Sequence, residues 1–219
     1  MVTIEQIREN AAIRTYIEKA DASLTALGYT EHSFPHVGKV ANTARDILLT
    51  LGYSAREAEL AQIAGYLHDI GNTVNRHDHA QSGALMAFRI LDKLGMDPAE
   101  IADIVSAIGN HDESTAYPVS AIAAALILAD KTDVRESRVR STEDVEIDIH
   151  DRVNYSVKRA ELAILPERGE LILSLAIDTS LCPVMDYFEI FLTRMKLCVL
   201  AARKLGLSFR LRINEQLLL

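Results

Sequence analysis

The sequence predicts a mainly α-helical protein that carries a small α+β unit at its C-terminal end. Two observations lead to this fold class. Over roughly the first 130 residues, apolar residues recur at helical spacing, with capping signals before them and glycines just after them. After about residue 140, the pattern changes to short apolar or alternating runs separated by turn residues, which are typical of strands. A chain of 219 residues is long enough to bury a substantial core.

The helices of the N-terminal part are predicted from their starts and ends. Thr3 to Gln6 and Ser54 to Glu57 match a capping box, in which two side chains three residues apart bond free backbone amides. Asp97 stands before a proline at the first helical position. Gly28 and Gly71 are among the glycines that follow apolar-periodic segments, where helices often end. The predicted helices cover residues 4–27, 34–51, 55–69, 79–94, 98–110 and 118–131.

The last third of the chain predicts a β-β-α-β subdomain. We expect strands at 153–157 and 171–177, with a turn at Pro166–Gly169 between them. A helical pattern follows at 182–205, and 208–218 alternates in part like another strand. The polar segment 141–146 predicts a loop. The predicted domains are therefore a helical domain at 1–140 and a small subdomain at 141–219.

Composition and charge narrow the classes of function. Hydrophobic residues make up 49% of the chain and charged residues 25%, which is typical of a globular protein. The formal net charge of −8 disfavours binding to a nucleic-acid polymer or an anionic membrane. The apolar run Val119–Ala129 is too short to span a bilayer, and the first residues do not resemble a signal peptide. Cys182 and Cys198 are predicted to be reduced, buried thiols, so we expect a cytoplasmic protein.

The pair His68-Asp69 is the most informative feature of the sequence. Both side chains are metal ligands, and they stand where an apolar helix is predicted to end at Gly71. Imidazole nitrogen combined with carboxylate oxygen suits iron, manganese, cobalt, nickel or zinc. The absence of a thiolate cluster argues against a structural zinc site. Further candidate ligands also stand at or near the ends of apolar helical segments: His36, His79, His111 and Asp130.

This ordered series resembles the H…HD…H…H…D pattern of the HD-domain metal-dependent phosphohydrolases. Leu67–Gly71 has the form of the namesake motif, His79 precedes a Gly-Ala pair by a short gap, and Leu128–Lys131 resembles the last ligand segment. The resemblance extends over about residues 32–140, more than half of the chain. It implies that the helical part is an HD-domain bundle.

The resemblance also implies a site for two divalent transition metal ions. One ion would be held by His36, His68, Asp69 and Asp130, and the second by His79 and His111 with Asp69 bridging. Such a pair of ions can clamp a phosphate, so the implied chemistry is in-line attack of metal-bound hydroxide on phosphorus. His68 and Asp69 are the predicted catalytic residues, with Asp69 acting as a bridge rather than as a nucleophile.

The predicted substrate is a small phosphorylated molecule, in the first place a nucleotide, whose ester or anhydride bond is cleaved. Its predicted contacts are Asn72, Asp112, Lys131 and Arg135. Asn72 stands where many relatives carry a lysine that can contact phosphate. The guanidinium of Arg135 matches two phosphate oxygens. Because Arg135, Arg138 and Arg140 are interleaved with Asp133 and Glu136, a salt-bridged exposed face is an equally open interpretation.

Several alternatives remain open from the sequence. His77 can replace His79 as a ligand, His32 lies outside the pattern, and His150-Asp151 repeats the dipeptide in a place that indicates a structural or exposed role. The chain can also be a catalytically weak nucleotide-sensing or assembly module, or, less favoured, a di-iron oxygenase. The alternating C-terminal strands offer an edge that can pair with a second copy, which leaves a homo-oligomer as an expectation.

Overall fold

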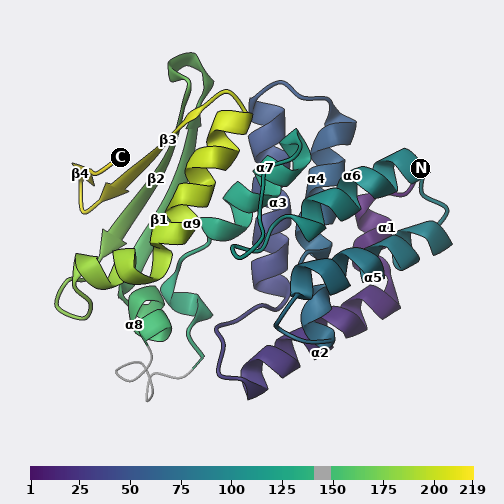
Figure 1. Ribbon diagram of the computed structural model, residues 1–219, viewed down its shortest axis with the longest axis horizontal. Coiled ribbons are helices and arrows are strands. Elements are labelled where there is room, and N and C mark those ends of the chain that lie inside the picture. Colours follow the sequence, from purple (N-terminus) through teal and green to yellow (C-terminus); the bar gives the residue numbers. More distant parts are fainter. Residues whose placement is uncertain (141–148) are drawn as a thin grey trace.

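The amphipathic segments of the first 131 residues form helices, as the sequence predicts. We describe a computed structural model, in which residues 1–140 and 149–219 are described (Figure 1). The helices of the N-terminal part are α1 (Ile4–Glu9), α2 (Ala11–Ala26), α3 (Phe34–Thr50), α4 (Ala55–Leu67), α5 (His79–Lys93), α6 (Pro98–Gly109) and α7 (Ala121–Lys131). Short 3₁₀ turns cover Ile70–Thr73 and Glu136–Arg138.

The predicted helix over 4–27 is wrong in one respect, because it is two helices divided at Asn10. The Asn10 side chain accepts hydrogen bonds from the backbone N–H groups of Ala12 and Ile13, at 3.0 and 3.2 Å. An asparagine side chain that satisfies these free amides starts a new helix at this point. The capping boxes predicted at Thr3 and Ser54 are both present.

Helix α7 lies at the centre of the bundle, and α3 and α4 pack closely beside it. The residues of α7 from Ile122 to Lys131 are all buried. Gly65 allows the close approach of α4 to α3, because a Cβ atom at this position would lie 2.8 Å from the Ala41 Cα. This contact brings the C-terminal end of α4, which bears His68, against the helix that bears His36.

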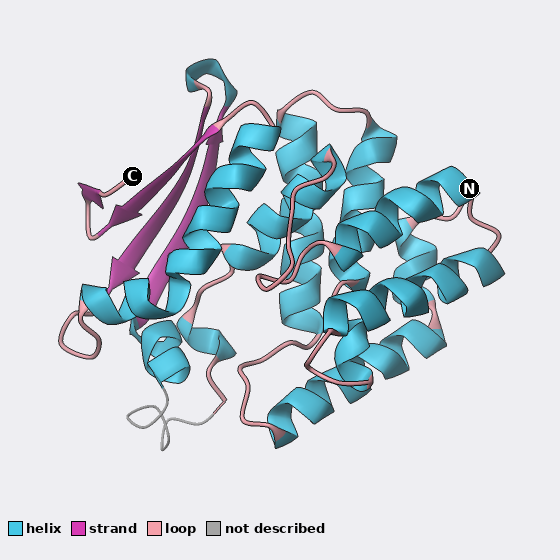
Figure 2. Ribbon diagram, in the orientation of Figure 1, coloured by secondary structure: helices cyan, strands magenta, loops and turns pink. Residues whose placement is uncertain are grey.

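The C-terminal part contains a four-stranded sheet and two helices (Figure 2). Its elements are α8 (Ile149–Ser156), β1 (Val157–Leu165), β2 (Glu170–Ile177), α9 (Val184–Lys204), β3 (Ser208–Ile213) and β4 (Gln216–Leu217). The strand order is β1-β2-β3-β4, with β2 and β3 parallel and the other two pairs antiparallel. Helix α9 connects the parallel strands and contacts both α7 and β3, so it joins the sheet to the bundle (Figure 1).

The strand predicted at 153–157 is wrong. Val153 and Asn154 belong to helix α8, and the strand begins only at Val157. Within α8, Val153, Asn154 and Ser156 are buried, and the Ser156 hydroxyl donates to the Val153 carbonyl oxygen at 2.7 Å. Packing of α8 against α9 and the Glu136–Arg138 turn favours the helix over the strand.

Other predictions for the C-terminal part are confirmed, and one requires a correction. The turn at Pro166–Gly169 joins β1 to β2, and Gly169 has a positive φ of 61°. The predicted strand over 208–218 is interrupted at Asn214 and Glu215, whose positive φ angles form the turn to β4. The loop predicted at 141–146 lies outside the described residues. Both cysteines are free and buried, as predicted. None of the described helices combines the length and hydropathy needed to cross a bilayer.

Candidate metal centre

All six predicted metal ligands lie together, because the ends of five helices converge on one buried site. His36 stands in the first turn of α3, and His68 and Asp69 follow the last residue of α4. His79 begins α5, His111 follows α6, and Asp130 lies in the last turn of α7. Their exposed fractions are all 9% or less, so the set is largely removed from water.

Each of the four histidines is oriented by a hydrogen bond to its Nδ1 atom. His68, His79 and His111 donate to the backbone carbonyl oxygens of Gly65, Arg76 and Ile108, at 2.9, 3.1 and 2.6 Å. His36 Nδ1 lies 2.8 Å from Asp133 Oδ2. A bond of this kind places the Nδ1 proton on the outer side of the ring and leaves Nε2 as the metal-ligating atom.

Two of the Nε2 atoms, those of His36 and His68, face the carboxylates of Asp69 and Asp130. His36 Nε2 lies 3.6 Å from Asp69 Oδ2 and 3.5 Å from Asp130 Oδ1. The corresponding distances from His68 Nε2 are 3.2 and 3.7 Å. Ligand atoms of His36, His68 and Asp130 lie within 4.8 Å of one another, which makes this group able to hold a metal ion.

Of the other two histidines, His79 faces the second oxygen of Asp69 and His111 lies beside His79. His79 Nε2 lies 3.6 Å from Asp69 Oδ1 and 3.2 Å from His111 Nε2. His68, Asp69 and His111 also offer ligand atoms within 4.8 Å of one another. One oxygen of Asp69 therefore faces His36 and His68 and the other faces His79, which is the arrangement that a bridging carboxylate requires.

The donor atoms themselves fit a metal. His36 Nε2, His68 Nε2 and Asp69 Oδ2 are buried and have no hydrogen-bond partner among the residues that the structure describes. Leaving a buried polar atom unsatisfied costs about 1–3 kcal/mol, so three such atoms facing one point indicate an absent cation. Nitrogen and oxygen donors suit a divalent transition metal. These two buried groups, His36 with His68 and Asp130, and His68 with Asp69 and His111, can thus hold metal ions.

The electrostatics of the site keep four of the ligands, His79, His111, Asp69 and Asp130, in their metal-binding forms. Burial lowers the pKa of His111 to about 3 and lowers the pKa of His79, so both rings are neutral at pH 7. Burial opposes ionisation of Asp69 and Asp130, but their charged neighbours, chiefly His68 and Lys131, hold both pKa values well below the usual range. His68 is the exception, because the neighbouring Asp69 raises its pKa although burial opposes the charged ring. A metal ion bound at His68 would therefore displace a proton from it.

Asp133 supports the His36 side of the site, and the sequence analysis assigned it no such role. Its Oδ2 atom accepts the bond from His36, and Oδ1 lies 2.7 Å from Lys39 Nζ and 2.9 Å from Arg135 Nε. The pKa of Asp133 falls far below its usual value because these bonds and the nearby Arg138 outweigh its burial. The signal that could have found it is its place three residues after Asp130, one helical turn away.

The four predicted substrate contacts occupy different environments. Lys131 is buried and lies 2.7 Å from Asp130 Oδ2 and 3.4 Å from Glu113 Oε1, and it lines the pocket. Asn72 is buried too, but it donates to the Asp69 carbonyl and Oδ1 oxygens, both at 3.0 Å. Asp112 accepts from Ser114, and Arg135 pairs with Asp133 and Glu31. Of these four residues, only Lys131 lines the pocket.

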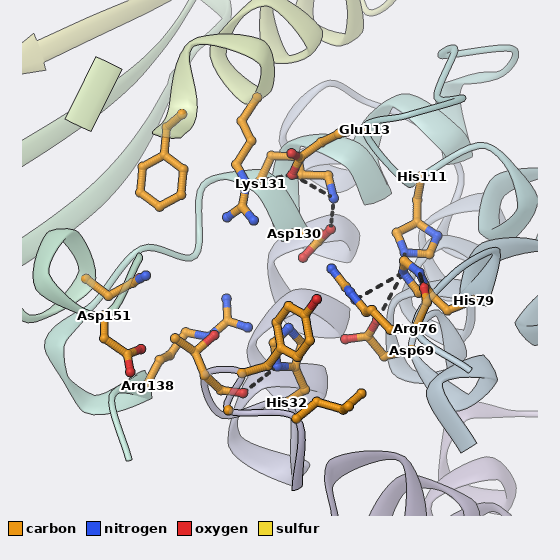
Figure 3. A pocket seen from close by; sticks show the side chains of 17 residues that line it. His32, Asp69, Arg76, His79, His111, Glu113, Asp130, Lys131, Arg138 and Asp151 are labelled. Carbon is orange, nitrogen blue, oxygen red and sulfur yellow. Dashed lines mark hydrogen bonds and ion pairs between the residues drawn. The ribbon is translucent and has the colours of Figure 1, made fainter. Parts of the chain in front are cut away.

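A pocket of about 490 Å³ opens over the ligand cluster (Figure 3). In Figure 3, Asp69, His79 and His111 lie at one side of this pocket and Asp151 at the opposite side. The sequence analysis missed several of its residues. His32, Arg76 and Arg138 come from the bundle, whereas Asp151, Asn154, Phe191 and Arg194 come from α8 and α9. Asp151, interpreted from the sequence as structural or exposed, is half-buried and lines the pocket.

Two further histidines are placed by their contacts. The His77 side chain is 87% exposed and pairs with Asp78, so it does not take the place of His79. His32 lines the pocket with its Nδ1 atom 2.6 Å from the Thr30 carbonyl oxygen, and its ring centroid lies 5.3 Å from that of His36. His32 is thus part of the site although it stands outside the ligand pattern.

Comparison with known proteins agrees with this geometry. The family model described as "HD domain" matches residues 34–155, more than half of the chain, so the chain belongs to the HD domain family. The match begins just before His36 and ends within α8. The chain is also 24% identical over 181 residues to an uncharacterized protein of Methanocaldococcus jannaschii, which covers 72% of this chain and 70% of the relative.

Proposed function

We propose that the protein is a metal-dependent phosphohydrolase that cleaves a phosphate ester or anhydride of a nucleotide or another small phosphorylated molecule. The observation that carries this proposal is the combination of the ligand cluster with a pocket lined by four basic side chains: Arg76, Lys131, Arg138 and Arg194. A pocket of about 490 Å³ suits a small molecule rather than a polymer.

The charge of the pocket explains why metal and substrate would bind together. The four basic side chains face four carboxylates, those of Asp69, Glu113, Asp130 and Asp151. The protein alone therefore offers no excess of positive charge to an anion. Divalent cations at the ligand cluster would make the pocket positive, and a phosphate group would then be attracted to it.

The roles of the ligands follow from their contacts. His36, His68 and Asp130 would hold one ion and His79 with His111 a second, and Asp69 would contribute one oxygen to each. When bound, the ions would supply charge stabilisation and an activated water. Asn72 would fix the orientation of Asp69 through its amide. Lys131 occupies Asp130 Oδ2 and so leaves Oδ1 to the ligand cluster.

Among the basic side chains that the helical bundle contributes to the pocket, Arg76 is the best placed to contact a phosphate. Its guanidinium lies over the Tyr29 ring, 5.3 Å from the centroid, and Nη1 lies 3.5 Å from His79 Nε2. A stacked guanidinium beside a metal ligand can donate to an anion bound there without a large rearrangement. Lys131 and Arg138 line the pocket as well, but their protein contacts to Asp130 and to the Glu31 and Asp133 carbonyls hold them more firmly.

The test is a phosphate-release screen with nucleotides and simple phosphate esters, on protein loaded with manganese, iron or cobalt. Asp69→Ala is the matched inactive variant, because this change removes the carboxylate that faces both groups. Exposed Asp46→Ala on α3 is the control. We expect release by the wild type and Asp46→Ala, and loss of both bound metal and activity in Asp69→Ala.

The outcomes separate the alternatives. Full activity in Asp69→Ala would refute the assignment of this centre. Nucleotide binding without turnover under any metal would replace the proposal with a sensing or assembly module. Oxygen consumption with a candidate substrate would replace it with oxygenase chemistry.

A further inference from the structure

Helices α8 and α9 of the C-terminal part form one wall of the pocket. Asp151 and Asn154 come from α8, and Phe191 and Arg194 come from α9. These residues stand far along the chain from the ligand motifs. The pocket above the metal ligands is therefore completed by an element outside the helices that supply the ligands, and such a wall is suited to select the substrate.

Arg194 is the basic residue of this wall, and its position is fixed from two sides. Its guanidinium lies over the buried Phe191 ring, 4.6 Å from the centroid. Its Nε atom lies 2.5 Å from Glu113 Oε1. A guanidinium fixed by stacking and by one carboxylate loses little further conformational freedom when it binds an anion.

The outer half of the same guanidinium is available. Among the described residues, Nη1 and Nη2 of Arg194 make no hydrogen bond, and the side chain lines the pocket with 23% of its surface exposed. These two nitrogens form the fork of donors that matches two oxygens of a phosphate. The closest contact of the Glu113 carboxylate is to Nε, on the inner edge of the group.

A row of alternating charges separates Arg194 from the ligand cluster. Arg194 contacts Glu113, Glu113 lies 3.4 Å from Lys131, and Lys131 lies 2.7 Å from Asp130. A phosphate bound at the metal ligands would therefore lie next to Asp130, and Arg194 would face a different part of the same substrate.

We infer that Arg194 is a specificity-determining residue that binds a second anionic group of the substrate. The substrate class is then a phosphoanhydride with at least two linked phosphates, rather than a simple monoester. This inference rests on the proposed function for the identity of the group at the metal end. The C-terminal part would then determine whether the protein prefers substrates with two linked phosphates over substrates with one.

The experiment measures binding without turnover. The ligands are phosphonate analogues of ADP and AMP, in which a methylene group replaces the cleavable oxygen, titrated by calorimetry into manganese-loaded protein. We expect the wild type to bind the ADP analogue at least about 10-fold more tightly. In Arg194→Gln, the affinity for the ADP analogue should fall by about 10-fold or more, as the loss of a charge-assisted, forked hydrogen bond predicts. The affinity for the AMP analogue should change by less than about 3-fold.

Controls separate this role from a structural one. Arg203→Gln on the exposed side of the same helix should keep the preference for the ADP analogue. Arg194→Lys should recover part of it, because the charge remains while the fork is lost. Metal content and thermal midpoint are measured for every variant. Equal loss for both analogues, no loss for either, or no preference in the wild type would overturn the inference. Binding with the expected preference but without hydrolysis of ADP would instead refute the proposed function alone.

Discussion

The two halves of the candidate metal centre use the same side chains but are held in different ways. On one side, His36 is oriented by the Asp133 carboxylate, which is itself bonded by Lys39 and Arg135. On the other side, His79 and His111 donate to backbone carbonyls three residues earlier in the chain. His68, on the first side, also donates to a backbone carbonyl, that of Gly65. The side-chain network is therefore confined to His36, and the second half depends wholly on the course of the backbone.

This difference indicates which substitutions would disturb each half of the metal centre. A side-chain network weakens when one of its members is replaced, whereas a bond to the backbone is removed only by moving the chain. Gly71 is the position at which the chain can be moved. A Cβ atom there would lie 2.5 Å from the Gly83 nitrogen and closer still to the His79 carbonyl oxygen.

The largest effect is expected from Gly71→Ala. The added methyl group must push α5 away from the Ile70–Thr73 turn, and His79 moves with α5. We expect the free energy of unfolding to fall by about 3 kcal/mol, with loss of metal from the His79 side. Urea unfolding and metal content per chain measure the two effects. Gly38→Ala, where a Cβ atom meets nothing within 4 Å, is the control and should not destabilise the protein.

The second-largest effect is expected on the number of metal ions bound per chain. His79→Ala combined with His111→Ala removes the imidazole that faces Asp69 Oδ1 and the imidazole beside it, but leaves the His36 group intact. We expect about two metals per chain to fall to about one, measured by elemental analysis after purification without chelator. An unchanged metal content would show that these histidines do not bind a second ion.

A smaller effect is expected for the side-chain network. Asp133→Asn keeps the size of the side chain but removes the charge that orients His36. Loss of such a supporting group typically lowers metal affinity by about 10- to 100-fold. Competition with a coloured chelator would measure this affinity. The number of metals at saturation should not change, and a loss of one metal would mean that Asp133 is itself a ligand.

The smallest effect is expected for Asn72→Ala. This change removes the amide that donates to the Asp69 carbonyl oxygen and to Asp69 Oδ1. The bond to Oδ1 holds the ligand itself, and its loss, about 1 kcal/mol, should lower metal affinity about 5-fold. The same chelator competition measures it. If Asn72 instead contacts the substrate, as the sequence predicts, Asn72→Ala should raise KM and leave metal affinity unchanged. Measuring both KM and metal affinity for this variant therefore decides between a metal-orienting and a substrate-binding role.

The sequence predicted the site better than the C-terminal fold, because the site residues stand beside local signals for helix ends. His68-Asp69 before Gly71 and His111 after α6 stand at helix ends that capping and glycine signals mark in the sequence. The segment Val153–Val157 had no such marker, since its apolar pattern fits a strand and a helix equally well. Asp133 was missed because its role consists of contacts to His36 and Lys39, which are almost 100 residues away.

The sequence by itself determined the helices of the bundle, the order of the six candidate ligands and the membership of the HD domain family. These depend on local periodicity and on side-chain chemistry, which a sequence displays directly. Only the tertiary structure decided which oxygen of Asp69 faces which histidines, and that Phe191 and Arg194 close the pocket. Such contacts arise when α9 packs between the sheet and α7, and no local pattern contains that packing.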